Sequence, residues 1–320
     1  MNQERGNKTA EPSLEIGLLG MKMRTPIIMA SGTFGYAFEI ARVAEFDFSQ
    51  IGAVVLKSVT LEPRQGNPPP RVAETPSGML NSIGLQNPGV DYVIRRYLGM
   101  LKNFDTNFIA GIAGDAIREY VECAGKLAAH GDIRAIEVNM SCPNVKDGRR
   151  FASDSGAAAE LIGAVKKGCR KPVIAKLAPG TGDIQEIARA CIDAGADALS
   201  VSNTYVGMVI DTHRRRPLLG NDAGGLSGPA IRPLAVHNVH LVYQAAARRD
   251  VPVIGCGGIM TGDDAAQMMI AGASAVQVGT AVFTNVHIAA DIAAGLGRYL
   301  IAQKEKEVSA ITGTLQLNRA

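Results

Sequence analysis

Ala135-Ile136-Glu137-Val138-Asn139-Met140-Ser141-Cys142-Pro143-Asn144 joins an apolar run to a polar segment. The run, Ile133 to Val138, predicts a strand buried on both faces, as in a parallel sheet. After it, Cys142 stands between amide side chains and before a proline, which is poor material for packing a core. A thiolate there could remove a proton while the amides hold a polar, planar substrate. The stretch therefore indicates a reactive site at the end of a parallel strand.

Similar apolar runs occur seven more times along the 320 residues. We expect them as strands at Pro26 to Ala30, Ala53 to Leu56, Phe108 to Ile112, Val173 to Lys176, Ala198 to Ser202, Val251 to Gly255 and Ala275 to Val278. Stretches of helical period lie between most of them, at Tyr120 to Ala129, Ala157 to Lys167, Asp183 to Ala194 and Gly262 to Ala271. This alternation predicts an α/β fold, a single-domain (β/α)8 TIM barrel, with a doubly wound open sheet as the alternative.

Four segments lie outside this repeat. Thr60 to Leu85 and Val206 to Gly228 are long, and long segments after barrel strands tend to be functional because those loops form the active-site face. Leu14 to Thr25 is expected as a hairpin closing the opposite end. Residues 1–12 are expected to be a disordered tail, which leaves 13–320 as the barrel domain.

Composition excludes several classes of protein. A net charge of +3 with scattered Lys and Arg does not favour nucleic acid, and the cluster Arg214 to Arg216 is read as a solvated loop. The five cysteines are widely spaced without C-x-x-C, which argues for a reducing compartment and against an internal zinc or iron–sulfur site. No apolar stretch approaches the roughly 20 residues of a membrane span, and Met1 to Pro12 lacks a signal-peptide core. We expect a cytoplasmic protein.

Glycines cluster where a barrel binds phosphate. Gly255-Cys256-Gly257-Gly258 ends the seventh strand, Gly279-Thr280 ends the eighth, and Ala223 to Gly228 could add another wall. Glycine lets backbone N–H groups approach an anion, and barrels commonly bind phosphate with the loops after these two strands. The alternative is that these glycines serve only tight turns. No G-x-G-x-x-G follows a first strand, so a Rossmann site is not supported.

Two lysines, Lys57 and Lys176, end apolar strands. A lysine in a buried strand needs a partner, so each could form a structural ion pair. They could instead stabilise negative charge on a cofactor, such as that on the pyrimidine edge of a reduced flavin. Lys176 could also form a Schiff base with a carbonyl substrate, as in a barrel aldolase, but that reading gives Cys142 no role.

Amides provide the polar groups that a ring of alternating C=O and N–H groups requires. Candidate residues are Asn81, Asn139, Asn144 and Asn203. A single asparagine would be interpreted as an ordinary turn residue, whereas four asparagines at one barrel mouth indicate a binding site. His237 and His240 could hold a metal, but no third ligand accompanies them, so we read them as part of a surface helix.

From Leu14 to Asn318, the chain resembles the class 1B dihydroorotate dehydrogenases. The matching motifs are Ala30-Ser31-Gly32-Thr33, Asn81-Ser82-Ile83-Gly84-Leu85-Gln86-Asn87, Asn139 to Asn144, Ser202-Asn203-Thr204 with Gly207-Met208, Gly224 to Gly228 and Gly255 to Ile259. Two positions depart from the family pattern. Tyr205 stands where an aliphatic residue is usual, and Ala152 follows Phe151 where glycine is usual.

The resemblance implies an FMN enzyme that oxidises dihydroorotate to orotate in pyrimidine biosynthesis. Cys142 would be the base at C5, with hydride passing from C6 to flavin N5, and Lys57 would be the second catalytic residue. The substrate-binding residues implied are Asn81, Ile83, Gly84, Leu85, Asn139, Asn144, Asn203 and Thr204. The cofactor-binding residues implied are Ser31, Gly32, Lys57, Asn139, Lys176, Ser202, Gly228, Gly257, Gly258, Gly279 and Thr280.

The resemblance also implies partners. A homodimer of this chain would bind an electron-transfer subunit carrying FAD and a [2Fe–2S] cluster, giving a heterotetramer that reduces NAD. A fumarate-using class 1A-like enzyme and a flavin barrel of the dihydropyrimidine dehydrogenase type are the enzymatic alternatives. A non-catalytic barrel that binds a phosphate ligand is the alternative from another class of protein.

Overall fold

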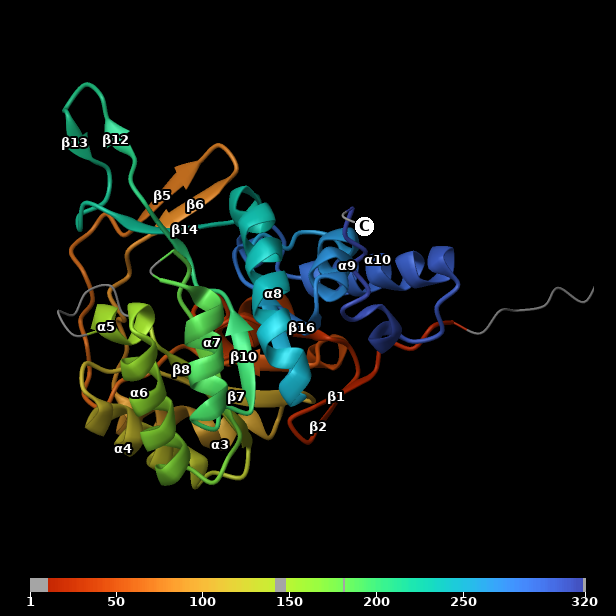
Figure 1. Ribbon diagram of the computed structural model, residues 1–320. Helices are drawn as coiled ribbons and strands as arrows, with labels where there is room; N and C mark the ends of the chain where they lie inside the picture. The colour runs from red at the N-terminus through yellow and green to blue at the C-terminus, as the bar shows by residue number, and fades with distance from the viewer. Residues whose placement is uncertain (1–10, 142–147, 181, 319–320) are drawn as a thin grey trace, which may run out of the picture.

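The computed structural model describes residues 11–141, 148–180 and 182–318, and eight of its strands form a closed parallel barrel (Figure 1). In order around the barrel they are β10 (Ala198–Val201), β15 (Val253–Cys256), β16 (Ala273–Val278), β3 (Ile27–Met29), β4 (Ala53–Val55), β7 (Asn107–Ile112), β8 (Ile133–Asn139) and β9 (Val173–Leu177). Each coincides with a predicted strand. The (β/α)8 barrel is therefore confirmed and the open sheet excluded, while the expected tail lies outside the described residues except for Glu11 and Pro12.

Helices surround the barrel because the strands also bury their outer faces. The longer helices are α4 (Ile117–Ala128), α6 (Ser155–Gly168), α7 (Ile184–Asp193), α8 (Arg232–Ala246), α9 (Gly262–Ile270) and α10 (Ile288–Gln303). Shorter ones are α1 (Phe38–Ala44), α2 (Val90–Val93), η2 (Ile94–Leu98), α3 (Gly99–Leu101) and α5 (Gly148–Ser153), with 3-10 turns η1 (Phe48–Gln50), η3 (Pro229–Ile231), η4 (Ala247–Arg249), η5 (Thr280–Phe283) and η6 (Val308–Ile311). All four predicted helices are present.

Side-chain caps fix where several of these helices begin. The Asp154 carboxylate accepts a hydrogen bond from the Ala157 N–H at α6, and Asp183 accepts two backbone N–H bonds at α7. Thr261 and Asp264 form a reciprocal capping box at α9. Each cap satisfies N–H groups that the first turn of a helix leaves without a partner.

A hairpin closes the amino-terminal end of the barrel, as expected for Leu14 to Thr25. It consists of β1 (Ile16–Leu18) and β2 (Met21–Met23), which are antiparallel. Leu18, Met21 and Met23 are buried in a cluster with the lowest inward-facing residues of the barrel strands. These strand residues are Ile28, Ala53, Val55, Ile109, Ala135, Ile174, Ala198, Ile254 and Ala275.

The two long segments that follow β4 and β10 meet in a second, antiparallel sheet at the other end of the barrel (Figure 1). Its order is β11 (Tyr205–Gly207), β14 (Gly224–Ser227), β6 (Gly78–Asn81) and β5 (Val72–Thr75). A two-stranded hairpin, β12 (Ile210–Asp211) and β13 (Arg216–Pro217), projects beyond it. These strands were not predicted, because they are two to four residues long and pair across large sequence separations.

Tyr205, one of the two departures from the family pattern, has a structural role. Its hydroxyl accepts a hydrogen bond from Asn238 Nδ2 at 2.8 Å, which joins the start of β11 to α8. Burial raises the pKa of the Tyr205 phenol, so it stays neutral in this contact. The other departure, Ala152, is a buried residue of α5.

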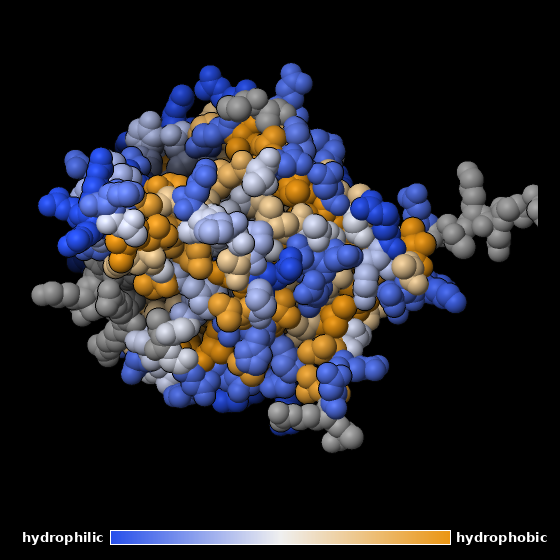
Figure 2. Space-filling model, turned by 90° about the horizontal axis from the view of Figure 1, so that it is seen from above, coloured by the Kyte–Doolittle hydropathy of each residue, from blue (hydrophilic) through white to orange (hydrophobic). Residues whose placement is uncertain are grey.

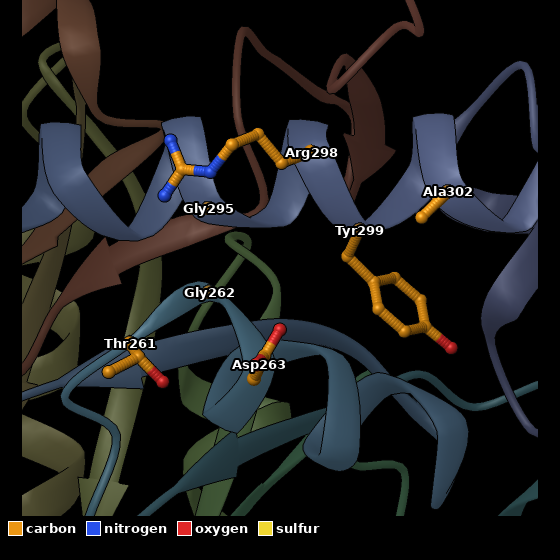
Figure 3. A pocket seen from close by; sticks show the side chains of 7 residues that line it. All are labelled: Thr261, Gly262, Asp263, Gly295, Arg298, Tyr299 and Ala302. Carbon is orange, nitrogen blue, oxygen red and sulfur yellow. The ribbon is translucent and has the colours of Figure 1, made fainter.

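The outer surface carries a recess where α9 and α10 cross (Figure 3). Gly262 and Gly295 touch there, and a Cβ on Gly262 would overlap the α10 backbone. Asp263, Arg298 and Tyr299 line the recess. It lies between two helices outside the barrel, and Thr261 and Gly262 at the beginning of α9 also line it.

Hydrophobic and hydrophilic residues are intermixed on the face seen from above (Figure 2). The most exposed large apolar side chains include Val206, with 78% of its surface accessible, and Ile210, with 56%, on β11 and β12. None of the helices in the described part of the chain combines the length and apolar character that a membrane crossing requires.

Candidate active site

Inward-facing side chains of the barrel strands form layers, and the upper layers are polar. Successive residues of a strand point to opposite faces. On β8, Ala135 therefore faces the barrel interior together with Glu137 and Asn139, whereas Ile136 and Val138 pack outward in the main core. The lowest layer is apolar, and the polar layers above it lie toward the carboxyl ends of the strands, where barrel enzymes place their sites.

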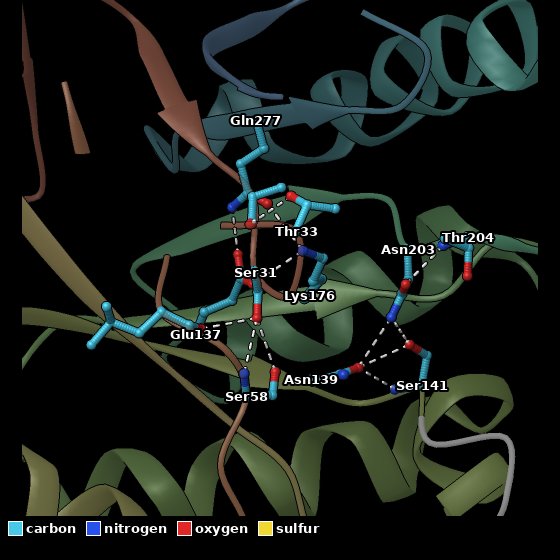
Figure 4. A network of polar contacts seen from close by, with 12 residues as sticks. Ser31, Thr33, Ser58, Glu137, Asn139, Ser141, Lys176, Asn203, Thr204 and Gln277 are labelled. Atoms are coloured by element: carbon cyan, nitrogen blue, oxygen red, sulfur yellow. Dashed lines mark hydrogen bonds and ion pairs between the residues drawn. The ribbon is translucent and has the colours of Figure 1, made fainter. Parts of the chain in front are cut away.

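The layer above the apolar one contains a closed triangle of side chains from β8, β9 and β16 (Figure 4). Lys176 Nζ lies 3.1 Å from Glu137 Oε1 and 3.0 Å from Gln277 Oε1. Gln277 Nε2 donates to the other carboxylate oxygen of Glu137. The three residues are only 6%, 1% and 1% exposed, respectively, for Lys176, Glu137 and Gln277. Lys176 thus forms a buried ion pair, which was one of the possibilities that the sequence analysis gave for it.

Glu137 and Gln277 were missed by the sequence analysis. A charged residue inside the apolar run Ala135 to Val138 was the available signal for Glu137. Gln277 lies in the same way within the predicted strand Ala275 to Val278. Neither was singled out because a strand pattern alone does not say which polar side chains meet across a barrel.

The charge state of Lys176 depends on this pairing. Burial by itself lowers the pKa of Lys176, but the attraction of the Glu137 carboxylate, with smaller contributions from Cys256 and the hydrogen bond, raises it overall. Burial raises the pKa of the Cys256 thiol, although the positive charge of Lys176 opposes that shift. Lys176 is therefore protonated and Cys256 neutral at ordinary pH.

Lys57 differs from Lys176 because its ammonium group has no ion-pair or hydrogen-bond partner among the residues that the structure describes. Burial lowers the pKa of Lys57. A Cβ on Gly32 would lie 3.9 Å from Lys57 Nζ and near nothing else, so this glycine leaves open space beside the ammonium. Lys57 is a largely buried cation that an anionic ligand would stabilise.

Ser31 holds the loop after β3 against the loop after β4 (Figure 4). Its hydroxyl donates to the Leu56 carbonyl at 2.9 Å and accepts from the Ser58 N–H at 3.1 Å. The Ser58 hydroxyl lies 3.2 Å from the same oxygen. These bonds bring the predicted cofactor residues Ser31 and Gly32 next to Lys57.

Two of the four predicted amides meet at the barrel mouth (Figure 4). Asn139 Oδ1 accepts hydrogen bonds from Asn203 Nδ2 at 3.2 Å, from the Ser141 N–H at 3.2 Å and from the Ser141 hydroxyl at 2.9 Å. Asn203 Nδ2 also donates to the Ser141 hydroxyl, and Asn203 Oδ1 accepts from the Thr204 N–H at 2.8 Å. The predicted base Cys142 and the fourth amide, Asn144, lie outside the described residues.

Asn81 lies on the upper sheet, at the end of β6. Its Nδ2 donates to the Gly225 carbonyl of β14 at 3.4 Å. Gly225 in turn packs so closely on Thr204 that a Cβ there would overlap the threonine side chain. The upper sheet thereby connects Asn81 through β14 to Thr204, the residue after Asn203.

The segment of Ile83, Gly84 and Leu85 follows β6 and is fixed by two asparagines to which the sequence analysis gave no role. Asn67 donates from its backbone N–H to the Ile83 carbonyl at 3.1 Å. Asn87 Nδ2 donates to the Leu85 carbonyl at 2.7 Å. Leu85 has a φ of 56°, an uncommon backbone conformation for a residue with a branched side chain.

Two of the predicted phosphate glycines, Gly257 and Gly258, have backbone conformations that favour glycine. Gly257 and Gly258 have φ values of 138° and 72°, and a Cβ on Gly258 would lie 2.6 Å from Arg232 Cβ. Asp264 accepts hydrogen bonds from the Met260 and Thr261 N–H groups at 2.9 and 3.0 Å and pairs with Arg232. This carboxylate joins the loop after β15 to the beginning of α8.

The remaining predicted cofactor residues lie at the same end of the barrel. Gly228 has a φ of 96° and precedes η3, which leads into α8. Ser202 follows β10, and its hydroxyl donates to the Asn203 carbonyl at 3.1 Å. Gly279 and Thr280 follow β16, and a Cβ on Gly279 would make only ordinary contacts, the nearest at 3.5 Å from Ala30. Their roles as cofactor contacts remain predictions.

A family of known proteins matches this chain over most of its length. A family model described as dihydroorotate dehydrogenase matches residues 13–300. Among curated relatives, the "Dihydroorotate dehydrogenase B (NAD(+)), catalytic subunit" of Citrifermentans bemidjiense is 49% identical over 307 residues, which are 96% of this chain and 99% of that protein. The protein of the same name from Desulforudis audaxviator is 48% identical over 93% of this chain and 96% of its own length.

A solved structure supports the fold independently. The crystal structure of a dihydroorotate dehydrogenase from Eimeria tenella superposes with a TM-score of 0.81 at 22% identity, covering 98% of this chain and 90% of that one. This likeness concerns the fold alone. Together with the family match over most of the barrel, the extended identity to the curated relatives shows that the chain belongs to the dihydroorotate dehydrogenase family.

Proposed function

We propose that this chain oxidises dihydroorotate to orotate with bound FMN and is the catalytic subunit of an NAD-linked enzyme. The relatives of 45–49% identity carry that name. The observation that supports it most directly is that Lys57, Lys176, Asn139 and Asn203 all lie at or just after the carboxyl ends of barrel strands, where Asn139 contacts Asn203. A buried and a partly buried ammonium group at the same end as paired amides suit an anionic, planar substrate next to an anionic cofactor.

The residues present fit FMN. Gly32 leaves open space beside Lys57, so a flat ring could approach the backbone there. Gly257 and Gly258, which precede α9, can direct backbone N–H groups at a phosphate. When bound, FMN would accept at N5 the hydride that leaves C6 of dihydroorotate.

Asn139 and Asn203 would orient the pyrimidine ring. Asn139 uses its carbonyl oxygen to accept bonds from Ser141 and Asn203, which leaves Nδ2 to donate to a substrate carbonyl. Asn81, Asn144 and Thr204 would complete the set, with the segment Ile83 to Leu85 along one side.

Cys142 would act as the base that removes the proton from C5. Ser141, the residue before it, is held to Asn139 through both its N–H and its hydroxyl, so the chain enters Cys142 from an anchored position. A free thiol has a pKa of about 8.5, so turnover should rise with pH until the thiolate is formed. The charge of Lys57 would favour that thiolate and hold the substrate carboxylate.

The visible spectrum of the purified chain tests this function. We expect flavin absorption that bleaches when dihydroorotate is added without oxygen. Cys142→Ser should retain the flavin but bleach about 10²- to 10⁴-fold more slowly, the usual contribution of a general base. A colourless chain would refute FMN binding, and bleaching of Cys142→Ser at the wild-type rate would refute the base. Bleaching by dihydrouracil instead would favour a dihydropyrimidine dehydrogenase type of barrel.

The electrons would leave through a second subunit. The relatives are named catalytic subunits, which implies a partner, and we propose one that carries FAD and a [2Fe–2S] cluster and reduces NAD in the cytoplasm. A homodimer of this chain would form the core of the heterotetramer, and Val206 and Ile210 offer exposed apolar contacts. Co-purification of an iron-containing subunit would support this, whereas full turnover of the isolated chain with fumarate would favour a class 1A-like enzyme.

A further inference from the structure

Glu137 is a fully buried carboxylate to which the proposed reaction gives no role. It neither reaches the amides at the barrel mouth nor contacts Lys57. Both of its oxygens are occupied, one by Lys176 and the other by Gln277. Burying a charged pair costs free energy, and well-packed apolar residues often replace such pairs without loss of stability. Stability alone therefore does not explain why this pair is buried in the barrel.

The two lysines of the site show what Glu137 changes. Lys57, which has no carboxylate partner among the described residues, has its pKa lowered by burial. Lys176 is more deeply buried, yet the Glu137 carboxylate outweighs the cost of burial and the pKa is raised. The pKa values of these two strand-end lysines thus shift in opposite directions, because Lys176 has a carboxylate partner among the described residues and Lys57 does not.

We propose that Glu137 is a positioning residue that acts through Lys176. It holds this ammonium protonated and in one place, so that the charge that Lys176 would offer to the cofactor is the same before and after reduction. This inference rests on the proposed use of FMN. Gln277 shares the triangle but carries no charge, so its part is to orient the other two side chains.

The groups that face Lys176 from its neighbours are few. Glu137 approaches from β8, Cys256 from β15 and Gln277 from β16. Ser200, its register partner on β10, is buried and uncharged. Because the Cys256 thiol is neutral at ordinary pH, Glu137 supplies the negative charge that keeps Lys176 protonated.

Proton uptake during reduction of bound FMN distinguishes a fixed charge from one that titrates. It is measured as the slope of the midpoint potential against pH, between pH 7 and 10. In the wild type, Lys176 keeps its proton, so one proton should enter with two electrons. In Glu137→Gln, Lys176 loses its proton as the pH rises and regains one from solvent on reduction, so uptake should approach two protons per two electrons.

Gln277→Leu is the matched control, because it removes a neighbour in the triangle but leaves the Glu137–Lys176 pair. It should retain an uptake of one proton, and so should Glu137→Asp, which keeps the charge. An uptake of one proton in Glu137→Gln, or of two in Gln277→Leu, would overturn the proposal. A wild-type chain that binds FMN but takes up two protons throughout would overturn it without any variant.

Unfolding of the chain without FMN tests the same idea if FMN does not bind. At pH 7 Glu137→Gln should be less stable than wild type, since Lys176 is then buried with a weaker partner. A base whose pKa falls on folding gains stability as the pH rises toward its unfolded value near ~10.4, so the deficit should shrink between pH 7 and 10. A constant deficit would overturn the proposal, whereas a colourless wild type with a shrinking deficit would count only against the proposed function.

Discussion

Replacing Lys176 with methionine should destabilise the chain strongly. The substitution keeps the length of the side chain but leaves the Glu137 carboxylate, which is 1% exposed, with only the Gln277 amide as a hydrogen-bond partner. Breaking a buried ion pair from one side typically costs about 3–5 kcal/mol, because the remaining charge has neither water nor a counterion. We expect a loss in that range for Lys176→Met at pH 7.

The double variant Glu137→Gln, Lys176→Met should recover much of that loss, because no charge then remains in the layer. We expect a deficit of roughly 1–2 kcal/mol for the double variant, with the rest appearing as a coupling between the two sites. Urea unfolding of the chain without cofactor, followed by circular dichroism, measures each free energy. If the double variant were as unstable as Lys176→Met, the cost would come from lost packing and not from an unpaired buried charge.

Three further predictions concern Lys57 and the glycine loops. Because burial lowers the pKa of Lys57, the free energy of unfolding should rise with pH from that lowered pKa toward ~10.4, and Lys57→Met should abolish this rise in a pH series of urea titrations. Lys57→Met should also slow flavin bleaching by dihydroorotate about 10²- to 10³-fold, as expected for the loss of a charge-stabilising group, and a wild-type rate in stopped-flow absorbance would contradict this role. Gly258→Ala should weaken FMN binding, measured by fluorescence titration, because the added Cβ would lie 2.6 Å from Arg232 at a φ of 72°. The control Gly297→Ala, in α10 with nothing within 4 Å of the added Cβ, should bind FMN normally and gain roughly 0.5–1 kcal/mol of stability.

The barrel was predictable because each of its strands is marked locally. Runs such as Ala53 to Leu56 are apolar on both faces, and this property depends on the strand alone. The hairpin at Leu14 to Thr25 was predictable for a similar reason. In contrast, β6 and β14 are four residues long, include glycines and pair across a separation of 144 residues between Asn81 and Gly225, so no local pattern marks them.

The candidate site was predictable where a polar residue ends an apolar strand. Lys57, Asn139 and Asn203 stand at such positions, and the structure places Asn139 against Asn203. Glu137 and Gln277 were not predicted, because their partner Lys176 lies on another strand and the closure of the barrel decides which inward side chains meet. The sequence also offered no means to see that, among the residues that the structure describes, Lys176 would have an ion-pair partner and Lys57 would not.

The hairpin of β1 and β2 determines at which end of the barrel small molecules can enter and leave. Leu18, Met21 and Met23 seal the lower opening with side chains that are 4% exposed or less, and an apolar layer lies directly above them. Dihydroorotate would then enter, and orotate would leave, at the opposite end of the barrel, where the strands have their carboxyl ends. Because orotate would also occupy the site that binds dihydroorotate, accumulated orotate should act as a competitive inhibitor, and its release through that end should help to determine the turnover rate.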